Sequence, residues 1–427
     1  MRLPSLVAGA ALLAAGCTPP ETGVPLDRPV FPTGLAVHPR GDRLAVVSSA
    51  FDWAYDDGAL LLADLELVRA ELAANDAEDR RDAIVEGAYV KAARIPRLGD
   101  RPVFSSGGER LLLATRFSNL LTSIDVDPDA GFSCGATDDD GTPRCGSSPQ
   151  ALQVPENDPF DVRIVSETRD DAGTLTRVDG IVTLLSSSTV YFFRDDRSRP
   201  GAAQMQITGN VDLGDLVRGV RAAALRSSGG VTWVVAAVET LATTGSAGTR
   251  LVMFRPSGDT LLSHYDVTAA VGSLSIHDVV VVPGAAGESD AVLALAWAPG
   301  ALLRFEIDEA PEGPLLRLAG VAESCAQPMS LALADKGGVQ RALVTCQGSG
   351  TVEAVDPRTL SVTGAVRFAG RAPYDVAVNP AFDEAYVSFF LDDSVGVLSL
   401  VDGSGAPRLD FMGRIGTPTE KPEDGRE

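Results

Sequence analysis

The sequence predicts an all-β fold: a seven-bladed β-propeller of four-stranded antiparallel blades with a short helical insertion. Short runs of alternating apolar and polar residues, separated by Gly, Pro, Asn and Asp, indicate many short strands. A similar unit recurs at intervals of about 45 to 70 residues. The composition, 45% hydrophobic and 22% charged, is typical of a globular chain. One four-stranded sheet cannot bury both of its faces, whereas a ring of seven buries each face against a neighbour.

The first seventeen residues have the pattern of a signal peptide. Met1 and Arg2 give a positive start, residues 3–16 are apolar or small, and Cys17 follows. This run is too short to span a bilayer as a helix. Residues 13–17 (LAAGC) resemble the lipobox of bacterial lipoproteins, which implies cleavage after residue 16 and lipidation of Cys17. An ordinary cleaved signal with an incidental cysteine is the alternative.

The residues after Cys17 favour a location and a tether. Thr18, in place of Asp, is typical of outer-membrane lipoproteins in diderm bacteria, so the resemblance implies a lipid anchor in the outer membrane, on its periplasmic face or at the cell surface. Residues 17–31 are polar and rich in Pro, and we expect a lipidated tether there. No later stretch is long and apolar enough for a transmembrane helix, so the acyl chains alone would hold the protein to the membrane.

The negative net charge argues against nucleic acids as partners. The chain has 36 Lys and Arg against 58 Asp and Glu, a formal charge of −22, and removal of the signal peptide with Arg2 makes it −23. Such a chain repels phosphate backbones, so we expect no nucleic-acid binding. We expect a monomer.

Seven units cover residues 32–416, which we take as one propeller domain. The clearest begin at Pro32 (PTGLAVHPRGDRLAVVSSA) and Pro373 (PYDVAVNPAFDEAYVSFFLDDSVGVLSLVD). In both, a Pro opens an alternating strand, a tight turn follows, and two further strands complete the pattern. The weaker copies begin at Pro102, Pro159, Arg218, Ile276 and Pro328. Six or eight blades, and two smaller β domains, are the alternatives.

These repeats resemble the YVTN family of β-propellers, whose unit reads roughly PxxVAVxPDGxxAYVTN. Ala385-Tyr386-Val387-Ser388 stands where the signature tetrapeptide falls, and the units at Pro328 and Pro32 follow it less closely. We expect residues 408–415 to supply the outermost strand of the last blade, with residues 24–30 as the alternative. Residues 417–427 are charged and are expected to be disordered.

Two insertions interrupt the repeats. Residues 66–85 are rich in Ala, Glu, Arg and Leu and predict one or two short helices, with Leu67, Leu72 and residues 84–85 on one side and a cap near residues 75–76. Residues 132–150 form a polar loop. Both fall between the third and fourth strands of adjacent units, so they are expected on one rim. A shared docking surface is one interpretation, and decoration of tolerant loops is the other.

The remaining four cysteines predict two disulfides. Cys134 and Cys145 flank the polar loop, and Cys325 and Cys346 flank a predicted hairpin. Zinc is the competing interpretation, but the chain has no CxxC and its three histidines are far apart in sequence. We therefore expect no metal site at the cysteines.

Three aspartates recur at one position of the repeat. Asp161, Asp278 and Asp375 each stand two residues after the start of a unit, with His277 and Tyr374 beside them. We expect these side chains at one mouth of the central channel, where converging carboxylates bind a cation or a cationic ligand group. The alternative is that each Asp accepts backbone N–H bonds at the turn of its own blade.

Two acidic runs are weaker cation candidates. Asp125, Asp127 and Asp129 have the spacing of a calcium loop without its later Glu, and residues 138–141 are more typical of a solvated turn. Calcium is thus a possible cofactor, and we expect no other.

No recognisable catalytic motif is present: the sequence lacks GxSxG, a Walker phosphate loop, GxGxxG, HExxH and CxxCH. Catalytic residues therefore stay unknown, and whether the protein is an enzyme is open. We expect a non-enzymatic envelope lipoprotein whose propeller is a binding or scaffold module for a protein, peptide or glycan. The alternative, suggested by related propellers, is a lactonase-like hydrolase that uses Asp161, Asp278, Asp375 and His277 at the channel mouth.

Overall fold

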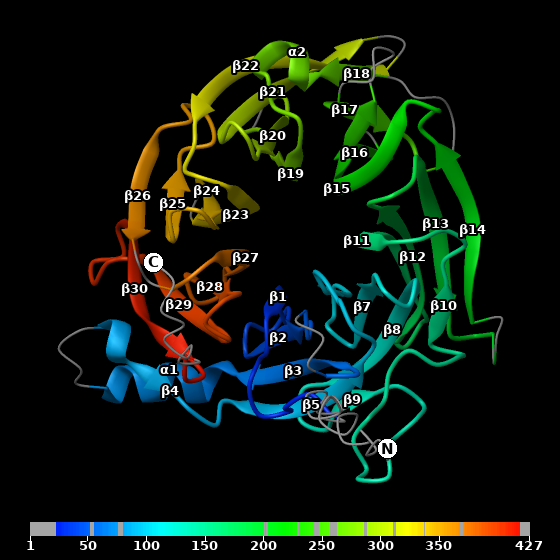
Figure 1. The fold of residues 1–427 in the computed structure, drawn as a ribbon, viewed down its shortest axis with the longest axis vertical. Helices are drawn as coiled ribbons and strands as arrows, with labels where there is room; N and C mark the ends of the chain where they lie inside the picture. The colour runs from blue at the N-terminus through cyan, green and yellow to red at the C-terminus, as the bar shows by residue number, and fades with distance from the viewer. Residues whose placement is uncertain are drawn as a thin grey trace, which may run out of the picture.

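A computed structural model shows seven antiparallel sheets arranged as the blades of a closed ring (Figure 1). It describes residues 23–51, 55–75, 80–199, 201, 204–228, 230–241, 247–256, 263–285, 288–310, 313–336, 338–367 and 370–418. The predicted seven-bladed β-propeller is therefore confirmed. The predicted signal peptide, Cys17 and most of the C-terminal tail lie outside the described residues.

The strands of each blade follow one another from the channel outward. Blade 1 has β1 (Pro32–Val37), β2 (Arg43–Ser48), β3 (Gly58–Asp64) and β5 (Tyr89–Ile95). Blade 2 has β6 (Val103–Phe104), β7 (Arg110–Thr115) and β8 (Leu120–Asp127), with β9 (Gly131–Ser133) and β10 (Ala151–Gln153) both paired to β8. Blade 3 has β11 (Pro159–Arg169), β12 (Leu175–Leu184), β13 (Thr189–Asp196) and β14 (Met205–Asp212).

The other four blades repeat this order. Blade 4 has β15 (Val217–Ser228), β16 (Val231–Leu241), β17 (Ala247–Phe254) and β18 (Ser263–Asp266), followed by the short helix α2 (Val267–Val271). Blade 5 has β19 (Ile276–Val282), β20 (Ala291–Ala296), β21 (Ala301–Ala310) and β22 (Gly313–Glu323). Blade 6 has β23 (Pro328–Lys336), β24 (Val339–Cys346), β25 (Thr351–Val355) and β26 (Val362–Arg367). Blade 7 has β27 (Pro373–Asn379), β28 (Glu384–Phe389), β29 (Ser394–Val401) and β30 (Pro407–Ile415).

The hydrophobic core lies between neighbouring blades, and strand β20 shows why. All six of its residues are buried, although successive side chains point to opposite faces of the sheet. Val292 and Ala294 join a cluster that includes residues of blade 4, whereas Leu293 and Leu295 join a cluster that includes residues of blade 6. A strand covered on both faces needs apolar residues at every position, which explains its sequence, AVLALA.

Ring closure uses the C-terminal strand, as predicted, and an element that was not predicted. Strand β30 pairs with β29 as the outermost antiparallel strand of blade 7. On its outer edge β30 pairs in parallel with β4 (Ile84–Val85), which belongs to the insertion in blade 1. The last blade is thus joined to the first by a sheet extension as well as by packing.

We call the insertion elements α1 (Leu65–Ala74), η1 (Arg80–Asp82) and β4 the clasp. Helix α1 begins at its N-cap Asp64, ends at Asn75 and buries Leu65, Val68 and Leu72, whereas Leu67 is only partly buried. The predicted helix is therefore present, but its buried side differs from the expected one at Leu67.

The clasp contacts blade 7 through polar and apolar groups. Arg69 Nη1 lies 3.1 Å from Glu384 Oε2, and the same guanidinium lies 3.7 Å from the centre of the Phe382 ring. A Cβ added to Gly413 of β30 would lie 2.5 Å from Leu72 Cδ2, so only glycine permits this approach. The clasp therefore packs against blade 7.

The second insertion packs against blade 1. Cys134 and Cys145 form a disulfide, and the loop that they close hydrogen-bonds to β5: Arg94 N donates to Pro143 O at 2.8 Å and Cys145 N donates to Arg94 O at 2.8 Å. The two insertions thus contact different blades, and each has a packing role of its own.

Residues 23–31, which we expected to be part of a tether, pack against the propeller. Val24 and Val30 are buried in the cluster that also holds residues of the clasp. Val30 N donates to Ser48 Oγ at 2.6 Å, and Phe31 N donates to Asp393 Oδ1 of blade 7 at 2.8 Å. Within the described residues no helix has the length and hydropathy needed to cross a membrane.

Candidate functional site in the central channel

One repeat position places a residue of each blade at the channel. We call the third residue of the innermost strand, and its equivalents, the channel position. It is occupied by Asp161, Asp278, Ser330 and Asp375 in blades 3, 5, 6 and 7 and by Gly34 in blade 1. The three aspartates expected to converge are therefore at equivalent places, and all three are buried.

Each of these aspartates connects its blade to the next one. Asp161 Oδ2 accepts from Ala223 N of blade 4 at 2.9 Å. Asp278 Oδ2 accepts from Leu331 N of blade 6 at 2.7 Å, and Asp375 Oδ2 accepts from Leu35 N of blade 1 at 2.9 Å. The expected alternative, a backbone N–H bond within the aspartate's own blade, is present at Asp278, whose Oδ1 accepts from Val279 N at 2.9 Å. All three aspartates also accept a bond across a blade interface.

Arg101 holds the channel position of blade 2. Its place follows from the turn between the first and second strands of a blade. In blade 2, Ser105 N donates to Arg110 O, and in blade 1, His38 N donates to Arg43 O at the equivalent turn. Arg101 lies four residues before Ser105, as Gly34 lies four before His38. The first strand of blade 2 is therefore offset by three residues from the unit that we began at Pro102.

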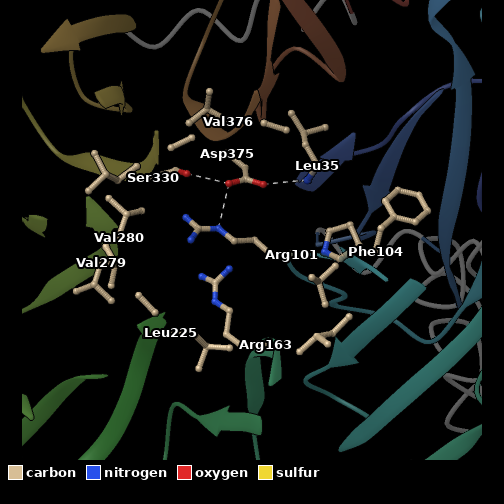
Figure 2. Close-up of a pocket in the computed structure, with 18 of the residues that line it drawn as sticks. Leu35, Arg101, Phe104, Arg163, Leu225, Val279, Val280, Ser330, Asp375 and Val376 are labelled. Atoms are coloured by element: carbon tan, nitrogen blue, oxygen red, sulfur yellow. Dashed lines mark hydrogen bonds and ion pairs between the residues drawn. The ribbon is translucent and has the colours of Figure 1, made fainter. Parts of the chain in front are cut away.

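The guanidinium of Arg101 lies between two of the aspartates. Arg101 Nη1 is 2.8 Å from Asp278 Oδ2. Arg101 Nε is 3.0 Å from Asp375 Oδ1, which also accepts from Ser330 Oγ at 2.8 Å (Figure 2). The chain thus supplies a cation of its own to these carboxylates. Binding of an added cation in the channel stays a prediction.

Burial and ion pairing have opposite effects on the pKa values of the charged groups in this network. Burial raises the pKa of Asp161 and of Asp375, and the nearby guanidinium groups offset only part of that rise. Burial lowers the pKa of Arg101, but the charges of Asp278 and Asp375 outweigh it, and the pKa is well above its usual value. Arg101 therefore stays charged, and its removal would leave buried carboxylates without their partner.

His277 and Tyr374 lie one residue before the channel position, and each is stacked on another ring. The ring of His277 is parallel to that of Trp297 at a centroid distance of 5.3 Å, and Tyr374 stacks on Phe390 at 5.5 Å. Burial, followed by the charges of Arg221 and Arg101, lowers the pKa of His277 to about 3. Burial also raises the pKa of Tyr374. At neutral pH both side chains are therefore uncharged.

Asp100 holds the corresponding place in blade 2. It is buried, and its Oδ1 accepts from Arg101 N at 3.0 Å. Burial raises the pKa of Asp100 to about 7, and the guanidinium of Arg101 offsets part of the rise. Asp100 therefore titrates near neutral pH.

A cavity of about 590 Å³ extends from Arg101 and Asp375 along the innermost strands. Its wall is mainly apolar, and Figure 2 shows the guanidinium groups of Arg101 and Arg163 directed into its middle. Arg163 Nη2 lies 3.1 Å from Asp161 Oδ2, and Arg163 Nε donates to Ala223 O at 2.7 Å.

The far end of this cavity reaches the turn that follows β6. Ser106 lines it there, and Ser106 N and Oγ donate to the carboxylate of Glu167 at 2.7 and 2.5 Å. His277 and Tyr374 are not among the described residues that line the cavity. Among the predicted site residues Asp375 lines the cavity, whereas Asp161 and Asp278 do not appear in its described wall either.

Sequence reasoning missed Arg101 and Arg163. The signal for Arg101 was the turn at residues 105–108, because counting back four residues from a turn locates the channel position even where the opening Pro is displaced. Arg163 had no such signal, since it stands at an ordinary strand position whose inward direction depends on the assembled ring.

The other candidate cation sites do not converge. Asp127 Oδ1 accepts from Asp129 N and Ala130 N, both at 2.8 Å, and so closes its own turn. Asp125 Oδ2 instead contacts Arg197 Nη1 at 2.6 Å. In the second run, Asp138 Oδ2 lies 2.9 Å from Arg94 Nε.

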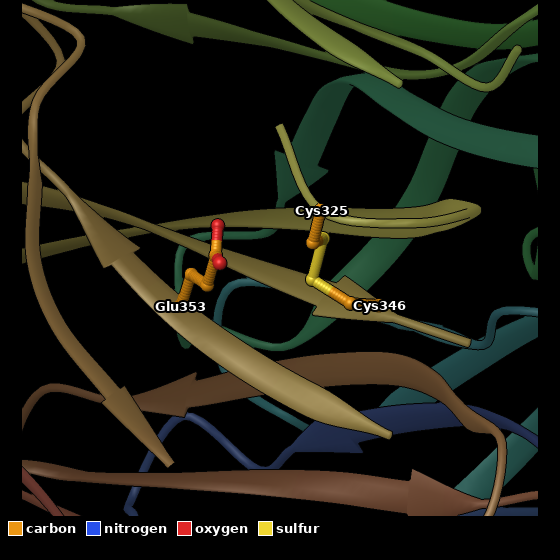
Figure 3. Close-up of side chains that lie close together, drawn as sticks. All are labelled: Cys325, Cys346 and Glu353. Carbon is orange, nitrogen blue, oxygen red and sulfur yellow. A yellow bond between two sulfur atoms is a disulfide. The ribbon is translucent and has the colours of Figure 1, made fainter. Parts of the chain in front are cut away.

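The second predicted cysteine pair is also joined. Cys325 and Cys346 form a disulfide, with their Cα atoms 5.8 Å apart. Their sulfur atoms and a carboxylate oxygen of Glu353 lie within 4.8 Å of one another (Figure 3), and burial raises the pKa of that carboxyl. Because the two sulfur atoms are bonded to each other, neither is a thiolate available to a metal.

Comparison with known proteins supports the fold alone. No protein-family model and no curated protein match the chain. Among solved structures, a chain of Kuenenia stuttgartiensis hydrazine synthase is similar with a TM-score of 0.59 and 14% identity, over 88% of this chain and 97% of that one. The β-propeller domain of Myceliophteria thermophila Cps50 (Swd1) is similar with a TM-score of 0.56 and 11% identity, over 87% of this chain and 96% of that one.

Proposed function

We propose that the protein is a lipid-anchored envelope protein whose propeller binds a partner at the open end of the central cavity and carries out no chemistry there. The observation that carries this proposal is the cavity itself, about 590 Å³ with a mainly apolar wall and two guanidinium groups in its middle. Such a concave site with few polar groups is typical of ligand binding.

Five of the six carboxylate oxygens of the channel aspartates have a hydrogen-bond or ion-pair partner, and the buried Oδ1 of Asp161 has no hydrogen-bond partner. Asp161, Asp278 and Asp375 each accept a backbone N–H from the next blade, and each also pairs with Arg101 or Arg163. A hydrolase of the lactonase type would need carboxylate oxygens that are free to bind a metal or activate water. These contacts therefore favour a binding role over a catalytic one.

The dimensions of the cavity suit a small part of a larger partner. A side chain, a chain end or a sugar unit of an envelope protein, peptide or glycan fits a space of about 590 Å³. Ser106 and Glu167 at the outer end supply hydrogen-bonding groups that such a partner meets first.

The envelope location is supported by the N-terminal sequence. The lipobox-like residues 13–17 precede the folded part closely, and only residues 18–22 separate Cys17 from the first described residue, Gly23. Lipidation of Cys17 would thus hold the propeller next to a membrane. The mass of the mature protein tests this point: an acylated N-terminal Cys17 is expected, and an unmodified one would remove the anchor from the proposal.

Affinity capture from solubilised envelopes tests the binding role. Ala332 lines the cavity and Ala319 is exposed on outer strand β22, so Ala332→Trp fills the site and Ala319→Trp is its matched control. We expect a partner that the wild type and the control capture and that Ala332→Trp loses. An unchanged set of partners for Ala332→Trp would place binding elsewhere. Lactone hydrolysis by the wild type that is lost in His277→Phe would favour the hydrolase alternative instead.

A further inference from the structure

The two disulfides of the protein lie in different surroundings. Cys134 and Cys145 are both buried, with exposed fractions of 3% and 4%. In the other pair Cys346 is completely buried, whereas Cys325 is partly exposed and lines a cavity of about 500 Å³ beside α2 and blade 5. The second disulfide is therefore approached from the side of Cys325.

The wall of this cavity suits a segment of a partner protein. Val271, Pro299 and Val321 contribute apolar groups, and the side chain of Val321 is 48% exposed. Glu323 and Ser324 add polar groups next to Cys325. A space of about 500 Å³ with this mixture of groups admits a side chain or the tip of a loop as far as the disulfide.

Glu353 lies beside both sulfur atoms of this pair. It stands two residues after Thr351 of β25, and Thr351 pairs with Cys346 of β24. A carboxylate oxygen of Glu353 and the two sulfur atoms lie within 4.8 Å of one another, as Figure 3 shows, and one water molecule bridges such a separation. Among the described residues no other Cys, His, Asp and Glu side chains form so close a group of three, so the first disulfide has no equivalent carboxyl.

The carboxyl of Glu353 keeps its proton to a higher pH than an exposed carboxyl does. Burial raises its pKa, and the charge of Arg367 on β26 offsets part of the rise. When a disulfide opens, one sulfur atom leaves as a thiolate, and a buried thiolate at Cys346 is costly unless it receives a proton. Glu353 is placed to supply that proton.

Backbone hydrogen bonds hold the two cysteines near each other without the disulfide. Gln347 N donates to Gln327 O and Gly348 N donates to Ala326 O, both at 3.0 Å. These bonds join the same two stretches of chain that the disulfide joins. The pair can therefore open and form again while the surrounding structure stays in place.

We propose that the Cys325–Cys346 disulfide exchanges with a dithiol of a partner protein, and that Glu353 is the proton donor. A thiolate of the partner attacks Sγ of Cys325, the bond to Cys346 breaks, and Cys346 takes the proton of Glu353. The partner's second thiolate then attacks the partner's sulfur in the mixed disulfide, and Cys325 leaves and takes a proton from water, as does Glu353. The partner's dithiol is oxidised to a disulfide, and the two electrons reduce the pair. This activity is separate from binding in the central cavity.

Reduction of the full chain by dithiothreitol tests the proposal. The reaction is followed between about pH 5 and pH 8, and free thiols are alkylated and located by mass spectrometry. We expect Cys325–Cys346 to be reduced about tenfold faster than Cys134–Cys145. Its rate constant, expressed per thiolate of the reagent, should rise as the pH falls, because protonated Glu353 is the active form.

Variants of two glutamates separate proton donation from a general effect of charge. Glu353→Gln should remove the rise and lower the rate at about pH 5 by about tenfold, whereas Glu353→Asp keeps an acid and should retain part of the rise. Glu323→Gln is the control, because Glu323 lines the same cavity but is not part of the group with the sulfur atoms. Equal melting temperatures show that all forms are folded.

Three results would overturn the proposal. The first is reduction of the two disulfides at equal rates. The second is a rise at low pH that survives Glu353→Gln. The third is a rise that is lost equally in Glu323→Gln, because the effect would then come from negative charge around the cavity and not from a proton donor.

Discussion

Arg101 of blade 2 and Asp375 of blade 7 occupy the same position of the repeat and form an ion pair, with 3.0 Å between Nε and Oδ1. One further contact joins Arg101 to Asp278 of blade 5. Equivalent positions in a ring point toward a common axis, so residues of blades that are not neighbours meet there. The channel thus connects blades that share no packing interface.

Replacing Arg101 should destabilise the whole ring. Arg101→Met leaves Asp278 and Asp375 buried without their shared cation, and we expect a loss of about 3 to 5 kcal/mol in the free energy of unfolding. Denaturant unfolding measures it. The control is Arg317→Met, because Arg317 also pairs with two carboxylates but is exposed, and its loss should be much smaller. Equal losses in the two variants would contradict the structural role of Arg101.

His277 should make stability depend on pH in the acid range. Its pKa is about 3 in the folded protein and 6.5 when unfolded, so between these values the unfolded chain binds a proton that the folded protein does not. The stabilising contribution is therefore complete above pH 6.5 and is lost as the pH falls toward 3. From pH 7 to pH 5 we expect wild type to lose about 1 to 2 kcal/mol relative to His277→Phe, which keeps a stacking ring. Parallel pH curves for the two proteins would refute this.

Asp100 should have the opposite effect to His277: it should lower the stability of the protein as the pH rises. Its pKa rises from 3.8 in the unfolded chain to about 7 in the folded protein, so the fold holds a proton that the unfolded chain releases. Its destabilising effect grows as the pH rises from 3.8 to 7 and is then constant. Asp100→Asn should therefore raise the melting temperature at pH 8 by about 2 °C or more and have little effect at pH 4. The comparison of melting curves at these two pH values checks the sign.

The clasp should contribute to global stability. Leu72 is buried against β30, and Leu72→Ala should cost about 2 to 5 kcal/mol. Leu67→Ala in the same helix is the matched control, because Leu67 is only partly buried and should cost less. If the two variants unfold at the same denaturant concentration, the clasp is a passive insertion and the ring closes without it.

The strand order was predictable because each repeat unit carries its own pattern of strand and turn residues within a short stretch of sequence. The innermost strands of blades 3, 5, 6 and 7 begin at Pro159, Ile276, Pro328 and Pro373, the residues at which the units were begun. Blade 2 was misplaced by three residues because its Pro102 stands at the place of Leu35 rather than of Pro32. That displacement hid Arg101, and with it the cation of the channel.

The contacts that close the ring could not be predicted from any short stretch of the sequence. Strand β4 is two residues long and pairs with residues 414 and 415, more than 300 positions away in the sequence. No periodicity is visible in two residues, and a parallel pair this distant depends on the completed ring. The burial of Val24 and Val30 was likewise hidden by a polar, Pro-rich composition that is typical of linkers.

The clasp also sets an order of events during biosynthesis. Its elements leave the ribosome with the first blade, whereas their partner β30 is the last strand to be made. Until blade 7 has been made, it cannot cover Leu65, Val68 and Leu72. The apolar side of α1 therefore stays incompletely covered through almost the whole synthesis of the chain. A chain that ends before β30 would leave Leu72 without its contact at Gly413, so we expect premature termination to expose apolar surface and to favour aggregation.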